Sequence, residues 1–131
     1  MTADRQRPVI LVIEDVEETR EGIERLLTAS GYQVSTARNE DEAIQNATYR
    51  QPDLILISLG LDASQIFLFA KRLRNAAELS QDVPVVAFSV ASLDEGDEVR
   101  AGYNLYMTRP ENFDQIRVLI ARILRELPRS A

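Results

Sequence analysis

The sequence predicts an α/β fold, in which helices cover both faces of a parallel sheet. Stretches with the pattern of buried strands alternate with amphipathic helices, as in βα units joined by right-handed crossovers. The run from Leu54 to Ile57 is apolar at every position, as expected for a strand that is covered on both faces. A length of 131 residues suits a single domain with one core. We therefore expect one domain spanning residues 1–131, with its core at about residues 8–127.

The first half of the chain predicts three strands and two helices. The strands are expected at Pro8 to Ile13, at Tyr32 to Ala37 near a sheet edge, and at Asp53 to Ser58. A helix is expected from Glu17 to Ser30, because Gly31 suits the residue that follows a helix. The second helix is expected after Asn39, which has Glu42 three residues on, the spacing of a capping box.

The second half predicts two strands and three helices. The helix after Ser58 is expected to bury one face, formed by Ile66, Phe67, Phe69, Ala70 and Leu73. Strands follow at Val83 to Ser89 and at Leu105 to Thr108. Between them, a short helix is expected from Asp94 to Ala101, although it contains Gly96. A strongly amphipathic helix begins near Phe113 and stops before Pro128.

Polar residues stand at the predicted carboxyl ends of the strands, where α/β proteins of this type bind ligands. The candidates are Glu14, Asp15, Ser58, Ser89 and the stretch Thr108-Arg109-Pro110. Ser58 ends a strand that is apolar on both faces, and a small hydroxyl residue there requires an explanation.

The composition excludes several kinds of chemistry. The chain has no cysteine and no histidine, which excludes disulfides, thiolate catalysis and the commonest general base. The net charge of −6 argues against nucleic acid as a partner. No apolar run approaches the length of a membrane span, and the start MTADRQRP has no apolar core region. We therefore expect a soluble, cytoplasmic protein without membrane contact.

Four stretches together resemble the response-regulator receiver (CheY-like) family over nearly the whole chain. They are VIEDVEETR, DLILISLG, VPVVAFSV and AGYNLYMTRP. The resemblance implies a flavodoxin-like, doubly wound sheet of five parallel strands in the order 2-1-3-4-5. The segment before Gly102 is shorter than in the family.

The resemblance also implies a phosphoryl-transfer site with five chemical positions. An aspartate takes the phosphoryl group from a phosphohistidine, and it holds Mg²⁺ together with an acidic pair. Glu14 and Asp15 match the acidic pair, and Ser89 matches the hydroxyl that binds the phosphoryl oxygens. Tyr106 matches the aromatic switch residue. A Ser89 that serves only as a satisfied hydroxyl at a strand end remains an equal alternative.

Two of the five positions depart from the family pattern. Ser58 stands where the phosphoacceptor aspartate is expected, and Arg109 stands where a lysine is expected. A serine is not an anion and needs a neighbouring base to become nucleophilic, so the family's acyl phosphate cannot form at Ser58. Arginine at 109 is also explained by composition, because Lys71 is the only lysine in the chain.

These departures lead to two structural predictions. We expect Arg109 to fork onto Asp15 or Glu14 and so to fill the pocket. We also expect a cis bond at Arg109–Pro110, as is common at the matching bond in the family. Any Mg²⁺ site at Glu14 and Asp15 should then be weak or vestigial, and we expect no other cofactor.

The favoured functional hypothesis is an atypical receiver that is not an enzyme and is not phosphorylated at the usual position. It would act in a two-component pathway by binding a kinase, an output protein or another receiver. The expected binding face is the fourth helix, the fifth strand and the last helix, with Tyr106 at its centre, and this face also suits a homodimer. A second apolar patch is considered at Leu68, if Phe67 or Phe69 flanks it.

Two other hypotheses stay open. One is a divergent, metal-dependent phosphotransfer at Ser58 or Asp62 with Glu14 and Asp15. The other is the binding of a small ligand at the strand ends. It ranks last because the chain has no glycine-rich phosphate loop.

Overall fold

A computed structural model describes residues 7–88, 90–100 and 104–126, and the predicted alternation of strands and helices is present there. In chain order the elements are β1 Val9–Glu14, α2 Glu17–Ala29, β2 Gln33–Ala37, α3 Glu40–Tyr49, β3 Leu54–Ser58, α4 Ala63–Ala76, β4 Val85–Ala87, β5 Glu98–Arg100, β6 Leu105–Thr108 and α5 Phe113–Glu126. The longest helices, α4 and α5, have 14 residues each. None of the helices in the described residues is both long enough and apolar enough to cross a membrane.

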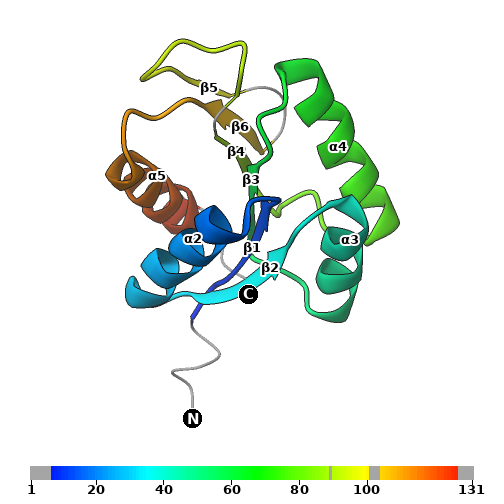
Figure 1. The fold of residues 1–131 in the computed structure, drawn as a ribbon. Coiled ribbons are helices and arrows are strands. Elements are labelled where there is room, and N and C mark those ends of the chain that lie inside the picture. Colours follow the sequence, from blue (N-terminus) through cyan, green and yellow to red (C-terminus); the bar gives the residue numbers. More distant parts are fainter. Residues whose placement is uncertain (1–6, 89, 101–103, 127–131) are drawn as a thin grey trace.

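The strands form one sheet in the order β2-β1-β3-β4-β6-β5 (Figure 1). The first five strands of that order pair in parallel, which confirms the predicted arrangement with β2 at an edge. Helices α2 and α5 lie on one face of the sheet, and α3 and α4 lie on the other (Figure 1). The carboxyl ends of the parallel strands consequently share one end of the sheet, where the sequence places the candidate site.

The short helix predicted for residues 94–101 is wrong, because this segment contains the edge strand β5 instead. Strand β5 pairs antiparallel with β6 and places Val99 opposite Met107. Val99 is the only apolar residue from position 94 to 100, so a helix here would have no apolar face to bury. Gly96 adopts a φ of +92° in the preceding turn, which suits glycine and breaks a helix. Pairing with β6 gives this segment main-chain partners along one edge of the strand.

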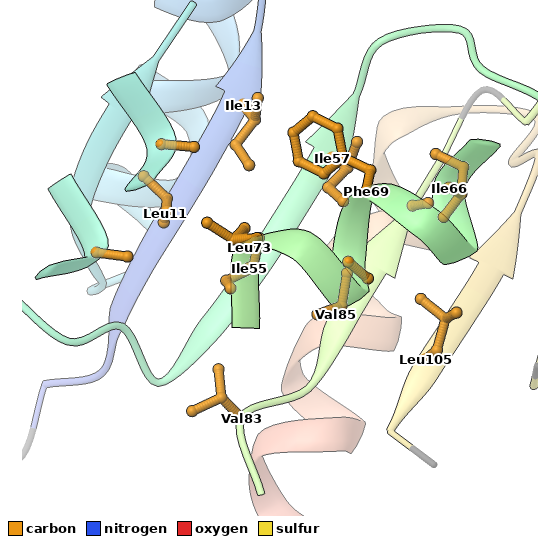
Figure 2. Packing of buried hydrophobic residues seen from close by; sticks show 14 of the residues in the cluster. Leu11, Ile13, Ile55, Ile57, Ile66, Phe69, Leu73, Val83, Val85 and Leu105 are labelled. Carbon is orange, nitrogen blue, oxygen red and sulfur yellow. The ribbon is translucent and has the colours of Figure 1, made fainter. Parts of the chain in front are cut away.

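The core consists of two apolar layers, one on each face of the sheet. In β3, Ile55 and Ile57 face α3 and α4, as Figure 2 shows for the neighbourhood of Phe69 and Leu73. Leu54 and Leu56 point the other way, into the layer formed with α2 and α5. All four β3 side chains are fully buried. Burial of each one stabilises the fold by about 1.5–3 kcal/mol.

Polar side chains define where two of the helices begin. Asn39 Oδ1 accepts a hydrogen bond of 2.9 Å from the Glu42 amide, which confirms the predicted N-cap of α3. Asp62 and Gln65 form a reciprocal capping box at the start of α4. These caps satisfy amides that have no partner within the helix.

The face that α4 buries differs from the prediction at one residue. Ile66, Phe69, Ala70 and Leu73 are buried as expected, but Phe67 is 51% exposed. Successive helical residues are rotated by about 100°, so Phe67 falls outside the stripe that Ile66 and Phe69 occupy. Leu68 is 52% exposed, and with Phe67 it forms a small apolar pair on the outer surface of α4.

Candidate functional site

Two polar side chains meet at the carboxyl ends of the central strands. Glu14 ends β1 and Ser58 ends β3, and the parallel ladder pairs these two residues directly. Ser58 Oγ donates a hydrogen bond of 2.5 Å to Glu14 Oε1. Both residues are buried, with exposed fractions of 4% and 7%. The ladder itself therefore positions the pair.

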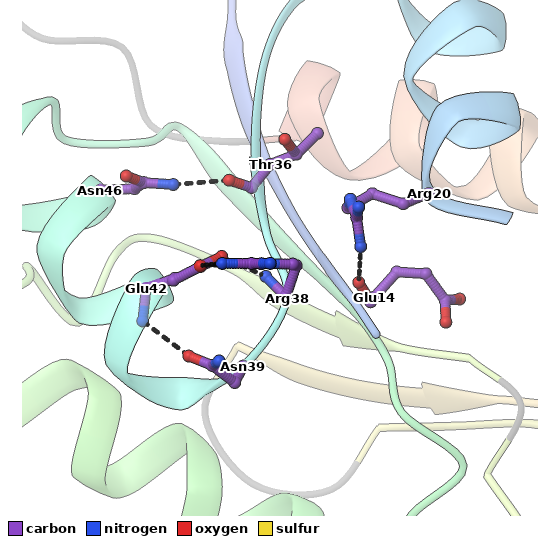
Figure 3. Close-up of polar contacts among 7 residues, drawn as sticks. All are labelled: Glu14, Arg20, Thr36, Arg38, Asn39, Glu42 and Asn46. Carbon is purple, nitrogen blue, oxygen red and sulfur yellow. Dashed lines mark hydrogen bonds and ion pairs between the residues drawn. The ribbon is translucent and has the colours of Figure 1, made fainter. Parts of the chain in front are cut away.

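The rest of Glu14 is also held by hydrogen bonds. Its second carboxylate oxygen, Oε2, accepts from the Val16 amide at 3.1 Å. Arg20 Nη1 donates to the main-chain carbonyl of Glu14 at 3.0 Å, and Figure 3 shows the carboxylate pointing away from Arg20. The buried carboxylate is thus satisfied by a hydroxyl and a main-chain amide rather than by a guanidinium.

The second member of the acidic pair, Asp15, is exposed and has no hydrogen bond or ion pair with another described residue. Mg²⁺ binds carboxylate oxygens and demands near-octahedral geometry. Both oxygens of Glu14 are already engaged, which leaves Asp15 as the one free carboxylate of the pair. In the described part of the chain, no three acidic or histidine side chains are grouped to hold a metal ion. The arrangement does not fit a tight Mg²⁺ site.

Arg109 does not enter the acidic pair, so the predicted ion pair is wrong. Its Nη1 donates to the carbonyl oxygen of Leu93 at 3.0 Å, and the side chain is exposed. Within the described residues, no ion pair links Arg109 to Glu14 or Asp15. The guanidinium contacts the segment that precedes β5.

The main chain explains the direction of Arg109. Its amide donates to the Asp97 carbonyl at 3.1 Å, and its carbonyl accepts from the Gly96 amide at 2.6 Å. These two bonds hold Arg109 against the turn before β5. The described residues contain no cis peptide bond, so Arg109–Pro110 is trans and the predicted cis bond is wrong. Trans is the lower-energy form of an X–Pro bond.

Tyr106, which the prediction places at the centre of a binding face, is buried. Its exposed fraction is 9%, and it belongs to the apolar layer beside α5. The guanidinium carbon of Arg100 lies 5.3 Å from the centre of its ring, a cation–π contact. The helix predicted for residues 94–101, which was the fourth helix of that face, is absent from the described residues. The face therefore consists of β5, β6 and α5. Ser89 lies outside the described residues.

Asp62, the alternative acceptor, is exposed and is used as a helix cap. Its Oδ1 accepts hydrogen bonds of 2.9 Å from the Gln65 amide and from Ser64 Oγ. The bond from the Gln65 amide is the main cause that lowers the pKa of Asp62 below its usual value, and the Ser64 hydroxyl contributes less. Asp62 therefore serves the start of α4.

An open pocket of about 560 Å³ lies at the same end of the sheet. The residues that line it include Gly60, Phe88, Arg109, Pro110 and Phe113. The rings of Phe88 and Phe113 pack edge to face, with centroids 5.8 Å apart. Neither member of the buried carboxylate–hydroxyl pair lines this pocket, so the two features are separate.

Sequence reasoning missed the hydrogen bond between Ser58 and Glu14. The sequence contained the information, because both residues end strands that are neighbours in the predicted strand order. Residues that are paired across neighbouring strands lie close enough for their side chains to make contact. The contact between Arg109 and Leu93 had no comparable signal, because it depends on the path of an irregular segment.

The comparisons with known proteins agree with the fold described above. The family model described as the response regulator receiver domain matches residues 10–121. Transcriptional regulatory protein KdpE of Staphylococcus aureus is 32% identical over 124 residues, which cover 92% of this chain and 51% of KdpE. PrrA of Mycobacterium leprae is 30% identical over 120 residues, which cover 90% of this chain and 50% of PrrA. The chain thus spans about half the length of these curated relatives.

A solved structure shows the same fold. The receiver domain of the sensor histidine kinase PA1611 from Pseudomonas aeruginosa superposes with a TM-score of 0.68 at 26% identity, over 92% of this chain and 99% of that one. In that structure a magnesium ion is coordinated in the active-site cleft.

Proposed function

The chain belongs to the response regulator receiver domain family, and from that premise we propose that it is an atypical receiver. It acts by binding a signalling protein and is not phosphorylated at the usual position. We propose a kinase, an output protein or another receiver as the partner, and we expect no catalytic turnover and no cofactor.

The observation that carries this proposal is the buried hydrogen bond between Ser58 and Glu14. The resemblance implies that position 58 is where the family carries its phosphoacceptor aspartate. An aspartate attacks as a ready anion, whereas a serine hydroxyl must first lose a proton. Here the hydroxyl proton is already directed at Glu14 Oε1, 2.5 Å away. The serine fills the position of the acceptor and satisfies the carboxylate that stands beside it.

The residues that the resemblance matches to a metal site support the same proposal. PA1611 holds magnesium in its cleft, but in this chain both oxygens of Glu14 have hydrogen-bond partners. A metal ion would have to break those two bonds before Glu14 could coordinate it. The third expected ligand, at position 58, is a neutral hydroxyl. On this proposal, the serine at position 58 both replaces the acceptor and engages Glu14, one of the expected metal ligands.

The surface available for output is the side of the molecule formed by β5, β6 and α5. Val118 on α5 is 63% exposed, and a shallow pocket of about 350 Å³ lies beside it. Glu98 and Arg122 form an ion pair across this surface at 2.5 Å. An exposed apolar residue with charged neighbours suits a protein partner that binds reversibly.

The test is the intact mass of the protein after incubation with acetyl phosphate and Mg²⁺. We expect no added phosphoryl group. An adduct that hydroxylamine removes would overturn the proposal, because it would be an acyl phosphate on some carboxylate. The parallel sample is the Ser58→Asp variant, in which a hydroxylamine-labile adduct shows that the assay detects a restored acceptor.

A second candidate function is phosphotransfer to Ser58 itself, and the geometry of the pair is the observation that favours it. A hydroxyl within hydrogen-bond reach of a carboxylate is the arrangement of a nucleophile and its base. The same measurement separates the two functions. An adduct that survives hydroxylamine and is absent from Ser58→Ala would establish phosphotransfer to Ser58 in place of the binding function.

A further inference from the structure

Among the described residues, the sheet has an unpartnered edge at β5, and this edge differs from the edge at the other end. All three residues of β5 are exposed, whereas four of the five residues of β2 are partly covered and the fifth is buried. Figure 1 shows β5 at the outer end of the sheet, with no helix beyond it. An uncovered edge strand presents unpaired main-chain groups that can bind another strand.

The alternation of the β5–β6 ladder identifies which main-chain groups point outward. Residue pairs in an antiparallel ladder alternate between hydrogen-bonded and non-hydrogen-bonded. The Arg109 amide donates to the Asp97 carbonyl, so in the same register Val99 and Met107 form the next bonded pair. The amides and carbonyls of Glu98 and Arg100 consequently point away from β6.

The side chains of β5 are self-complementary about Val99. Glu98 precedes Val99 and Arg100 follows it, so a two-fold axis through Val99 places each glutamate opposite the arginine of a second copy. Opposite charges that face each other across an antiparallel pair are favourable, and like charges are unfavourable. A pairing centred on Glu98 or Arg100 would put like charges together. Edge strands that only resist pairing commonly carry lysine, whereas this strand carries one charge of each sign.

We propose that β5 binds β5 of a second copy of this chain, antiparallel and centred on Val99, to form a homodimer with one continuous sheet. In this register the outward main-chain groups of Glu98 face those of Arg100 in the partner. The same register therefore satisfies both the main-chain hydrogen bonds and the charge pairs. The two Val99 residues form a non-hydrogen-bonded pair, in which side chains approach most closely. Val99 is 43% exposed in the single chain and supplies the apolar part of the contact.

Two existing contacts hold the charged residues in place for this pairing. Glu98 Oε2 accepts from Arg122 of α5, and the Arg100 guanidinium lies over Tyr106. Both contacts are within one chain and lie on the α5 side of the sheet, so they leave the strand edge free. A three-residue strand buries little surface, well below the roughly 1,000 Å² typical of a stable interface. The dimer should therefore be weak and concentration-dependent.

This proposal goes beyond the proposed function and does not depend on it. Dimerisation at β5 can be found in a protein that is phosphorylated, and absence of phosphorylation can be found in a monomer. The result of the cross-linking experiment and the result of the phosphorylation experiment can therefore contradict one proposal without the other.

The first experiment is oxidative cross-linking of a Val99→Cys variant. The natural chain has no cysteine, so any disulfide joins two copies at position 99. The matched control is Tyr49→Cys, because Tyr49 is 91% exposed and lies on α3, away from β5. We expect cross-linking at position 99 to be roughly tenfold faster than at position 49, because pairing raises the effective concentration of the two thiols. Equal rates at both positions would overturn the proposal.

The second experiment tests the register with charge reversals in the Val99→Cys background. Glu98→Arg places arginine opposite arginine, and Arg100→Glu places glutamate opposite glutamate, so each change should slow cross-linking. The double variant should restore the rate. A mixture of the two single variants should give cross-linked heterodimers in preference to homodimers.

The mixing result separates pairing from any damage to the fold. Each single variant is checked by circular dichroism, since Glu98→Arg removes the bond with Arg122. A damaged strand would not recover when mixed with another damaged strand, whereas complementary charges would. Single variants that cross-link as fast as their parent would rule out the register centred on Val99.

Discussion

Ser58 and Glu14 form a buried hydrogen-bonded pair at the strand ends, where the resemblance implies a phosphoacceptor and a metal ligand. The hydroxyl donates to one carboxylate oxygen, and the Val16 amide donates to the other. A buried carboxylate without such donors would be costly. Under the proposed function, the serine at position 58 stands in place of the nucleophile and also donates a hydrogen bond to the acid beside it.

Restoring a carboxylate at position 58 should make the stability of the protein depend on magnesium. Ser58→Asp places a second acid against Glu14, so without metal we expect the free energy of unfolding to fall by about 1–3 kcal/mol. With both acids and Asp15 available, Mg²⁺ should recover part of that loss. Thermal unfolding with and without Mg²⁺ measures both effects.

The control for this change is Ser58→Asn, which has a similar size and no charge. It should show no response to Mg²⁺. If the stability of Ser58→Asp is equally insensitive to Mg²⁺, then a carboxylate at position 58 does not restore metal binding at the acidic pair. Our account of position 58 would then be incorrect.

The position of a site residue was predictable where the residue ends a buried strand. It was not predictable where an irregular turn holds the residue. Ser58 and Glu14 follow from the order of buried strands, although their hydrogen bond was missed. The ion pair of Arg109 with the acidic residues was predicted from the preference of arginine for carboxylates, and it is not formed. The turn before β5 binds both main-chain groups of Arg109 and directs its side chain to Leu93. The path of that turn has no periodic pattern in the sequence.

Helix α3 shows how a short element depends on its ends. It has ten residues and only two of them, Ala43 and Ala47, are buried. Short helices are marginal without tertiary or capping contacts. Its N-terminus has the Asn39 cap, and Glu40 connects it to Arg72 on α4 through two bonds of 2.8 Å. The terminal contacts therefore carry much of its local stability.

Removal of the α3 cap should destabilise the protein measurably. Asn39→Ala leaves the Glu42 amide without its acceptor, so we expect a loss of about 1 kcal/mol in the free energy of unfolding. Urea denaturation followed by circular dichroism measures the loss. Asn39→Asp, which keeps an acceptor and adds a favourable charge at the helix start, should be at least as stable as the natural protein. A loss of the same size in both variants would contradict the capping role.

The contact between α3 and α4 should depend on pH. The hydrogen bond from Arg72 is the main cause that lowers the pKa of Glu40, and burial opposes it. A lowered pKa in the folded state means that the contribution of Glu40 is complete above its unfolded value of about 4.3. That contribution is lost as the pH falls through the folded pKa. Glu40→Gln should therefore reduce stability at pH 7 and have little effect near pH 3.

Denaturation curves at several pH values test this dependence, with Asp41→Asn as the matched control. Asp41 lies in the same first turn, is exposed and has no partner among the described residues. It experiences the same helix dipole without the arginine contact. A pH profile of equal steepness for both variants would assign the effect to the dipole and not to Arg72.

The segment before Gly102 was the element that sequence reasoning could not predict. Its residues are mainly acidic, and Val99 is the only apolar one between 94 and 100. Strand formation there depends on β6, a partner that follows later in the chain, and β-propensity is decided by such neighbours. The resemblance indicated that the segment is short, which is consistent with a strand replacing a helix.

The whole molecule is organised as one sheet between two pairs of helices. The fold was predictable because β1 and β3 are apolar at nearly every position, a pattern that indicates a strand covered on both sides. Ile55 and Leu56 are adjacent in sequence, yet they belong to different layers. Because both layers share the same strands, we expect a substitution that destabilises one layer to destabilise the other layer as well.

Truncation of one side chain in each layer tests this shared stability. Ile55→Ala and Leu56→Ala each delete a fully buried side chain, so each should lower the free energy of unfolding by about 2–5 kcal/mol. Urea unfolding followed by circular dichroism and by tyrosine fluorescence should give coincident curves for both variants. Separate transitions for the two probes would show that the layers unfold independently.

The Val16 amide has a consequence for hydrogen exchange. Val16 is 52% exposed and lies between β1 and α2, where amide protons normally exchange quickly with water. Its proton, however, is donated to the buried carboxylate of Glu14. We expect this one amide to exchange more slowly than that of its exposed neighbour Asp15, as measured by NMR in deuterated water. Its protection would disappear whenever Glu14 turned toward a metal ion or a bound partner, so a single resonance would report the occupancy of the site.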